Sequence, residues 1–548
     1  GLMEDPKKRV VINKDVCEGC GDCSVQSNCV SIEPLETELG RKRKINQSNC
    51  NKDYSCIKGF CPSFVTVDAE IKNNTGFKDL GELPEPQFKT NQDINNIMLT
   101  GIGGTGVLTI SAILAYAAHY EGKDASVLDM TGLAQKGGAV WSHIKIFEKN
   151  NKPYSQKIAP GAANVLLACD GVVGTKPEIQ EVISKEKTIA VLNSNTIPVA
   201  DFITQRDIDF KNNDVFQMLE NTTNTIISSV PAINISEKLS GDAIGTNMLM
   251  LGSAYQNGLI PLKAENIFKA IELNGIGIER NIYNFNLGRL YTINPNHEIF
   301  SFLAENEVLN LNSIELFEDR LKRIENYDQR VVDDFIKDKN TIDQILSEEA
   351  DTENITKEAI KELYRVYAIK DEYEVARMHL ESTSKILDST FTAWNNLKFY
   401  LSPPIISFIK DKRTQRPIKI AIPGYIALPI FKILKSMKFL RGTIFDPLNL
   451  TEDRRRDKEH KAIFRNKLAE ISNLITGVKS NKLLELIEAS KDVKGYGPVR
   501  AESYEIFKSR INFTSKKGLR VLRNIFRFKT RNNIQACLLY TSDAADDD

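Results

Sequence analysis

The sequence predicts a multidomain α/β protein, and three observations support that prediction. Seven of the nine cysteines lie between Cys17 and Cys61, which indicates a compact metal-binding module. A glycine-rich turn at residues 101–106 joins an apolar strand to an apolar helix, as in a Rossmann-like domain with a parallel sheet. Residues 291–400 contain no glycine and many charges, which predicts a mainly helical C-terminal domain.

Composition excludes several classes of protein. The chain has 548 residues, enough for about three or four domains. Its formal net charge is zero, so we expect no nucleic acid and no membrane surface as its partner. No apolar run reaches the ~18 residues of a membrane span. No secretory signal is recognisable, and we expect a cytoplasmic protein.

Residues 8–69 are predicted to form a ferredoxin-like module. Cys17, Cys20 and Cys23 have C-x2-C-x2-C spacing, and Cys61 is followed by proline. This is close to the two-cluster bacterial ferredoxin pattern, in which three cysteines of one motif bind one four-iron cube and the fourth binds the other. The flanking segments RVVIN and VTVDA are expected to be strands that pair across the module.

Exchange of the fourth ligand between the motifs predicts two 4Fe-4S clusters. The first would be bound by Cys17, Cys20, Cys23 and Cys61, and the second by Cys29, Cys50 and Cys56. The remaining ligand position of the second is Asp53, which makes that motif C-x2-D-x2-C. A carboxylate or a water could complete this cube, or it could be a 3Fe-4S cluster.

Two other kinds of site are compatible with the cysteine content. Zinc sites normally show paired C-x2-C elements, which Cys56 and Cys61 lack, and disulfides do not fit a cytoplasmic chain. Between the motifs, residues 40–44 (GRKRK) predict a solvated hairpin tip. The alternative is a basic contact for an acidic electron carrier.

Residues 70–95 predict a polar linker, and residues 96–290 predict an α/β domain. The turn after its first strand has G-x-G-x-x-G spacing and begins a helix, whose free amides can hold an anion. The turn glycines are Gly101, Gly103, Gly104 and Gly106. Asp129 has the spacing of a ribose-binding acid, which indicates NAD. The alternative is a turn that only lets helix and strand pack closely.

The next segment differs from a dinucleotide-binding domain, which would have a helix there. Residues 132–147 predict a strand preceded by a polar, glycine-rich run of Gln135, Lys136, Gly137 and Gly138. Its glycine pair can approach a ligand or a neighbouring domain closely. We expect His143 to be packed or at the surface, and Cys169, in a further parallel strand, to be inert core.

Residues 291–513 are predicted to be mainly helical. Residues 355–370 place Ile360, Leu363 and Tyr367 on one face, with Thr356 as cap, which indicates a core-facing helix. A further helix is expected to start near Thr451. Several arginines could meet an anionic ligand such as the phosphates of coenzyme A, and the alternative is surface salt bridges. They are Arg441, Arg454, Arg455, Arg456 and Arg500.

Four stretches together resemble the large fused indolepyruvate ferredoxin oxidoreductases of the 2-oxoacid:ferredoxin oxidoreductase superfamily. They are the cysteine module, GIGGTGV, QKGGAVWSHIKI and AIELNGIGIERNIYNFNLGR. The resemblance covers residues 8–513 and implies that residues 96–290 form the superfamily's gamma domain, which is not an independent NAD-binding unit. Residues 514–548 fall outside it, and the ending CLLYTSDAADDD is typical of an adapter or assembly artefact.

The resemblance implies oxidation of an aryl 2-oxoacid with coenzyme A to arylacetyl-CoA and CO2, with reduction of ferredoxin. Thiamine diphosphate and Mg would be held by domains that family members carry before the ferredoxin module. No such segment precedes Cys17, so we interpret the chain as the C-terminal part of a longer enzyme, inactive alone and without a catalytic residue that can be assigned. The implied partners are those domains, ferredoxin and further copies in a homo-oligomer.

Two other functions would use the same residues. One is a non-catalytic iron–sulfur subunit that docks a separate thiamine-binding subunit. The other is an NAD(P)-ferredoxin oxidoreductase, in which the glycine turn and Asp129 would bind the dinucleotide.

Overall fold

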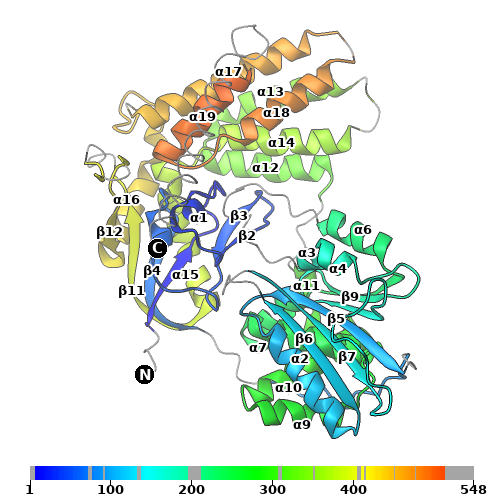
Figure 1. Ribbon diagram of the computed structural model, residues 1–548. Coiled ribbons are helices and arrows are strands. Elements are labelled where there is room, and N and C mark those ends of the chain that lie inside the picture. The colour runs from blue at the N-terminus through cyan, green and yellow to red at the C-terminus, as the bar shows by residue number, and fades with distance from the viewer. Residues whose placement is uncertain are drawn as a thin grey trace, which may run out of the picture.

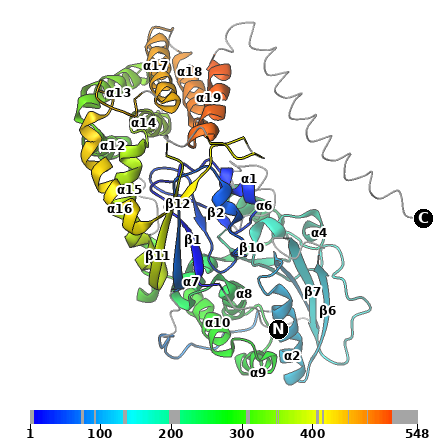
Figure 2. The same ribbon diagram turned by 90° about the vertical axis from the view of Figure 1, so that its left-hand side faces the viewer.

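The computed structural model describes residues 6–71, 77–89, 93–131, 138–195, 212–305, 311–347, 349, 352–403, 409–412, 415–449, 451–475 and 477–511. The elements fall into a cysteine module, an α/β domain and a helical region (Figure 1). Figure 2 shows the module between the other two parts. No helix within these ranges is long and apolar enough to cross a membrane.

The cysteine module is built on a short antiparallel sheet. β1 (Lys8–Ile12) pairs with β4 (Phe64–Ile71), which confirms the two strands predicted to flank the cysteines. Val10, Val11 and Ile12 of β1 are buried, which is why this segment is extended and pairs. Between the two strands lie α1 (Asp22–Ser27), the hairpin of β2 (Ile32–Leu35) and β3 (Lys42–Ile45), and the short 3-10 helix η1 (Ser55–Lys58).

The C-terminal region adds two strands to this sheet, which the sequence analysis did not anticipate. β11 (Phe391–Leu401) pairs antiparallel with β4, and β12 (Ile420–Pro423) pairs with β11, so the order is β1-β4-β11-β12. Phe391 and Phe399 of β11 are buried against the sheet. A segment placed in a mainly helical domain therefore completes the sheet of the cysteine module.

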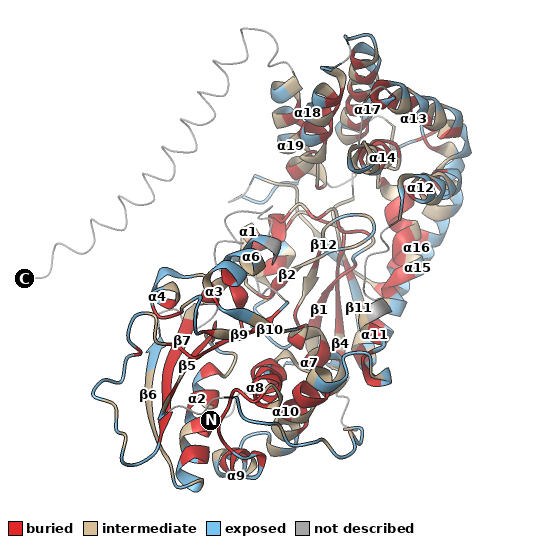
Figure 3. Ribbon diagram, turned by 90° about the vertical axis from the view of Figure 1, so that its right-hand side faces the viewer, coloured by how far each residue is buried: buried red, intermediate tan, exposed pale blue. Residues whose placement is uncertain are grey.

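The α/β domain contains a six-stranded sheet of order β10-β9-β8-β5-β7-β6. Its strands are β5 (Ile94–Ile102), β6 (Asp124–Thr131), β7 (Ala139–Phe147), β8 (Val165–Ala168), β9 (Ile189–Asn193) and β10 (Thr225–Val230). β5, β8, β9 and β10 run parallel, whereas β7 is antiparallel to both β5 and β6. The strand β7 confirms the departure from a dinucleotide-binding domain. Figure 3 shows that the inner strands are buried.

Helices cover this sheet on both faces. They are α2 (Val107–Tyr120), α3 (Gly171–Gly174), α4 (Pro177–Gln180), α6 (Asn212–Thr222), α7 (Ala232–Ser240), η2 (Ala243–Gly245), α8 (Thr246–Gln256), α9 (Ala264–Asn274), α10 (Ile278–Ile293), η3 (Glu298–Phe300) and α11 (Phe302–Glu305). α8 and α10 cross closely at Gly252, which has no Cβ. A Cβ there would lie 1.9 Å from the carbonyl oxygen of Phe285. The described part of the predicted linker packs on this pair, where Arg289 donates to the carbonyl oxygen of Pro84 at 3.0 Å.

The helical region contains a bundle with its own core. It comprises α12 (Ser313–Tyr327), η4 (Gln329–Val331), α13 (Val332–Leu346), α14 (Glu353–Tyr367), α15 (Glu372–Thr390), α16 (Gly424–Ser436), η6 (Met437–Leu440), α17 (Glu452–Ser472), α18 (Lys479–Lys491) and α19 (Gly497–Ile511). Of the predicted stripe of α14, Leu363 and Tyr367 belong to this core, and Ile360 is also buried. Thr356 is not its cap, because α14 begins at Glu353; Thr451 does cap α17.

Four of the five predicted arginines form ion pairs, two of them in the interior. Arg441 and Arg454 both bind the buried carboxylate of Asp371, at 2.5 and 2.6 Å. Arg456 pairs with Glu452 along α17, and Arg500 pairs with Asp457 at 2.6 Å. The salt-bridge alternative therefore accounts for these four arginines, although Arg441 and Arg454 are buried rather than at the surface.

Candidate iron–sulfur centre

The cysteines of the module gather into two groups. Burial raises the pKa of Cys20 well above its ordinary value, and the nearby charges of Cys61, Cys23 and Cys17 raise it further. Burial also raises the pKa of Cys56 to about 12, with Cys50 and Cys29 adding to the effect. We call Cys17, Cys20, Cys23 and Cys61 the first cysteine group, and Cys29, Cys50 and Cys56 the second. These are the ligand sets derived from spacing, and their ligation of iron stays a prediction.

The two groups are presented by loops of the same backbone shape. In the first loop the N–H of Gly19 donates to Cys17 Sγ at 3.3 Å, and in the second the N–H of Lys52 donates to Cys50 Sγ at 3.4 Å. Positive φ angles recur at two matching positions of each loop, namely 70° at Gly19, 72° at Gly21, 58° at Lys52 and 58° at Tyr54. A lysine and a tyrosine rarely adopt this conformation, so the second loop keeps a costly shape that it shares with the first.

Asp53 occupies the position in the second loop that Cys20 occupies in the first. Burial and the neighbouring thiols raise the pKa of both Cys50 and Cys56, and the charge of Asp53 raises it further. The carboxylate of Asp53 therefore lies beside the second group. Asp53 is exposed, and its Oδ1 accepts a hydrogen bond from the N–H of Ser55 at 3.1 Å. Ligation of a cluster by Asp53 stays a prediction.

Neither disulfides nor a single-ion metal site is present among the described residues. All eight cysteines in the described ranges are free thiols, so the structure gives no support to disulfides there. Among the same residues, no three His, Cys, Asp or Glu side chains converge closely enough to hold one metal ion. Zinc requires such convergence, with sulfurs about 2.3 Å from a single point. A cube instead offers a separate iron to each thiolate, so its ligands stand further apart.

Basic side chains of the hairpin lie beside the first group. Lys42 and Arg43 on β3 are 7% and 1% exposed. Burial raises the pKa of Cys23 and the charge of Arg43 opposes that rise, while burial lowers the pKa of Lys42 to about 7. The prediction of a solvated tip at residues 40–44 is therefore wrong for these two residues. The hairpin exists, but its second strand carries both cations into the interior.

The C-terminal region supplies contacts to the first group that sequence reasoning missed. Lys370 Nζ donates to the carbonyl oxygen of Cys17 at 2.9 Å, and Tyr496 donates to that of Val16 at 2.6 Å. Arg416 and Lys419 contact the same loops, over 394 and 358 residues of chain respectively. No local pattern distinguishes such residues from surface lysines and arginines, because only the fold brings them to the cysteines.

The glycine turn of the α/β domain packs against the helix that follows it and is hydrogen-bonded to the residue that precedes β7. A Cβ on Gly101 would lie 2.5 Å from the side chain of Val107, and the N–H of Gly103 donates to the carbonyl oxygen of Gly138 at 2.7 Å. Gly104 and Gly106 adopt φ angles of 88° and 91°. These contacts agree with the packing role proposed as the alternative, and a ligand at the turn stays a prediction. Gln135, Lys136 and Gly137 lie outside the described residues.

Asp129 is not placed as a ribose-binding acid would be. It lies on the edge strand β6, which β7 separates from β5, whereas a dinucleotide fold puts that acid on the neighbouring parallel strand. Its Oδ1 accepts hydrogen bonds from Ser111 at 3.0 Å and from Ser142. His143 and Cys169 are both buried, and burial raises the pKa of Cys169, as expected of core residues.

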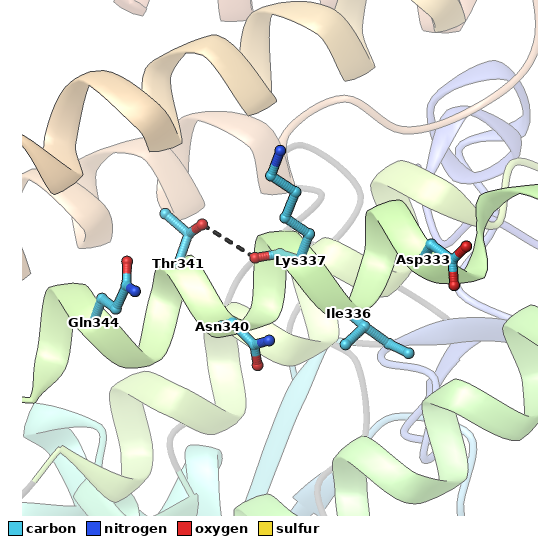
Figure 4. Close-up of a pocket in the computed structure, with 6 residues that line it drawn as sticks. All are labelled: Asp333, Ile336, Lys337, Asn340, Thr341 and Gln344. Carbon is cyan, nitrogen blue, oxygen red and sulfur yellow. Dashed lines mark hydrogen bonds between the residues drawn. The ribbon is translucent and has the colours of Figure 1, made fainter.

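A surface hollow of about 380 Å³ lies along α13, far in the sequence from the cysteines (Figure 4). All six residues that line it come from this one helix, and Thr341 donates to the carbonyl oxygen of Lys337 at 3.1 Å. It contains none of the residues predicted for a site, so it is no part of the candidate iron–sulfur centre.

Comparison with known proteins assigns two parts of the chain to families. Residues 96–291 match the family Pyruvate ferredoxin/flavodoxin oxidoreductase. Residues 315–512 match a family of unknown function, DUF6537. The α/β domain is thus similar to a family of oxoacid ferredoxin oxidoreductases, and the region after it matches a family without an assigned role.

The curated relatives of this chain are subunits of indolepyruvate oxidoreductases. The indolepyruvate oxidoreductase subunit IorB of Archaeoglobus fulgidus is 28% identical over 177 residues, which are 32% of this chain and 83% of the relative. The subunit of the same name from Pyrococcus horikoshii is 25% identical over 197 residues, or 35% of this chain and 93% of the relative. The protein is therefore related to the indolepyruvate ferredoxin oxidoreductases.

Parts of two solved structures are also similar to this chain. The pyruvate oxidoreductase subunit PORC of Thermotoga maritima shares 20% identity with a TM-score of 0.25, over 36% of this chain and 96% of that one. The 2-oxoglutarate:ferredoxin oxidoreductase of Magnetococcus marinus shares 15% identity with a TM-score of 0.28, over 37% of this chain and 32% of that one.

Proposed function

We propose that this chain is the electron-transfer and gamma-domain part of an indolepyruvate ferredoxin oxidoreductase. The reaction would be oxidative decarboxylation of an aryl 2-oxoacid with coenzyme A to arylacetyl-CoA and CO2, with reduction of ferredoxin. The observation that carries the electron-transfer role is the pair of cysteine groups on loops of matching shape. The aryl substrate rests on the relatives, which are indolepyruvate oxidoreductase subunits.

The two cysteine groups would each hold one cluster, the second completed by Asp53 or water. Bound there, iron–sulfur clusters accept and pass single electrons at potentials set by their surroundings. The protein contributes those surroundings. The N–H groups of Gly19 and Lys52 donate to the sulfurs of Cys17 and Cys50, and the buried Arg43 offsets negative charge beside Cys23.

The two groups differ in their access to solvent. Three of the four thiols of the first group are buried, whereas Cys29 and Cys50 of the second are half-buried and Asp53 is exposed. A ferredoxin would therefore approach the second group. Electrons would arrive at the first from thiamine diphosphate-binding domains, which would also hold Mg and the substrates, outside this chain. Operation in the cytoplasm and as a homo-oligomer belongs to the same proposal.

The test is the iron and acid-labile sulfide content of the full chain after anaerobic purification, with EPR of the reduced protein. About eight irons per chain, or about seven with an oxidised three-iron signal, would support two clusters. About four would leave only the first cysteine group occupied. Zinc without sulfide would overturn the electron-transfer role.

A second candidate is a non-catalytic iron–sulfur subunit that docks a separate thiamine-binding subunit. It is favoured by the relatives themselves, which are described as subunits. Mixing the iron-loaded chain with an indolepyruvate oxidoreductase subunit that binds thiamine diphosphate would distinguish the two. Oxoacid-dependent reduction of ferredoxin only in the mixture supports the subunit, and activity of a continuous longer chain supports the fused enzyme.

A further inference from the structure

We infer that Lys419 is a positioning residue that sets the reduction potential of the cluster in the first cysteine group. Part of the DUF6537 region, which contains Lys419, would thereby enclose that cluster. The inference rests on the proposed function, because it requires a cluster there. It gives a role to a residue of a region that matches only a family of unknown function.

The contacts of Lys419 are unusual for a lysine. Its Nζ donates to the carbonyl oxygens of Ile57 at 2.8 Å, Gly59 at 2.6 Å and Cys61 at 3.1 Å. The same Nζ lies 4.8 Å from the ring centre of the buried Phe64. All three hydrogens of the ammonium are thus used on protein groups, which fixes the position of the charge.

These carbonyl groups belong to the connection between the two cysteine groups. Residues 57–61 run from Cys56 of the second group to Cys61 of the first, and this connection is the crossing that supplies the fourth ligand. A Cβ on Gly59 would lie 2.8 Å from Cα of Cys23, so the connection also packs directly on the first loop. The ammonium therefore holds the segment that joins both ligand sets.

Arg416 anchors the same segment of the C-terminal region on the other side. Its Nη1 donates to both carboxylate oxygens of Asp22, at 2.9 and 3.0 Å, and Asp22 is 1% exposed. Oδ2 of Asp22 also accepts a hydrogen bond from the N–H of Phe60 at 2.8 Å. Arg416 thus binds the first loop through Asp22, and Lys419 binds the connection.

A fixed cation beside a cluster favours its reduced form, because reduction adds a negative charge. Removing the charge of Lys419 should therefore make the cluster harder to reduce. We expect a roughly tenfold change in the equilibrium between oxidised and reduced cluster, which for one electron is about 59 mV toward more negative potential.

The experiment is a potentiometric titration of the anaerobically purified, iron-loaded chain, followed by EPR. Lys419→Gln removes the charge but keeps an amide that can donate to the carbonyl groups. Lys419→Arg keeps the charge. Lys412→Met is the matched control, because it removes a lysine charge at an exposed position of the same segment. The expected result is a more negative potential in Lys419→Gln alone, with iron content equal to that of the native chain.

Other outcomes overturn the inference. An unchanged potential in Lys419→Gln, or an equal shift in Lys412→Met, would show that the charge at this position is not special. A folded Lys419→Gln chain without iron would show that Lys419 serves assembly and not the potential. Should the glutamine variant not fold, Lys419→Met takes its place under the same criteria. A native chain without iron would instead refute the proposed function. This outcome differs from all those that refute only the role of Lys419.

Discussion

Replacing Asp53 with cysteine tests the second cluster most directly. The first loop presents Cys20 at the position that Asp53 occupies in the second, on a backbone with the same two positive φ angles. A cysteine at residue 53 should therefore find the place of a fourth ligand without rearrangement of the loop. Because the native carboxylate is turned toward Ser55, we expect its bond to iron to be the first to break.

The size of the effect follows from the site. The native chain should lose one iron of the second cluster on exposure to air and fall from about eight to about seven irons, whereas Asp53→Cys should keep about eight. The substitution removes hydrogen bonds to the N–H and Oγ of Ser55, at 3.1 and 2.9 Å. At an exposed position this costs about 0.5–1.5 kcal/mol, too little to unfold the module.

The assay compares iron per chain before and after oxidation, together with the three-iron EPR signal. That signal should appear in the oxidised native chain and be absent from Asp53→Cys, and the potential of the second cluster alone should move. Asp68→Cys provides the control, because it adds a thiol on β4, outside both loops. Equal iron loss in the native chain and in Asp53→Cys would refute the reasoning, since residue 53 would then not face the cluster.

Three further predictions follow from packing and burial. Gly59→Ala would place Cβ 2.8 Å from the backbone Cα of Cys23, so it should lose about four irons per chain, whereas Gly174→Ala, with ordinary 3.7 Å contacts, should lose none. In Gly252→Ala the new Cβ would lie 1.9 Å from a carbonyl oxygen of α10, so the substitution should destabilise the α/β domain by about 3 kcal/mol. Thermal unfolding measures this loss, and a loss no larger than that of Gly174→Ala would contradict the close crossing of α8 and α10. Burial lowers the pKa of His379 to about 4, so the unfolded chain binds the proton more readily, and stability should fall by up to about 3 kcal/mol as the pH drops from 6.5 to 4. A His379→Phe chain that loses the same stability in this range would show that another group is responsible.

Local patterns were sufficient for the elements whose causes lie within a few residues. The apolar run at residues 107–120 is the helix α2 from end to end, and the valine-rich segments before Cys17 and after Cys61 pair as predicted. The cysteine spacing also led to two ligand sets, whose occupation by iron stays a prediction. In each case the determining interactions are periodic burial or short loops, which a sequence displays directly.

The remainder could not be predicted because it depends on distant pairing. Lys42 and Arg43 have the composition of a solvated tip, and only the placement of β3 against the interior buries them. β11 follows a helix-rich stretch, and its strand conformation is stabilised by β4, which lies more than 300 residues earlier. Nothing in the sequence near Lys419 distinguishes it from the other lysines, because only the pairing of β11 with β4 brings it to the cysteines.

The pairing of β4 with β11 has a consequence for synthesis in the cell. More than 300 residues separate the two strands, and a ribosome adds about 5–20 residues per second, so β4 must wait tens of seconds for its partner. During that interval one edge of β4 is open to other chains, a known route to aggregation. Lys419 and Arg416 are still untranslated then, so any iron inserted early would meet an open site. Cluster insertion and completion of the polypeptide are thereby coupled in time, and shortened chains that end before β11 should accumulate as iron-poor aggregates.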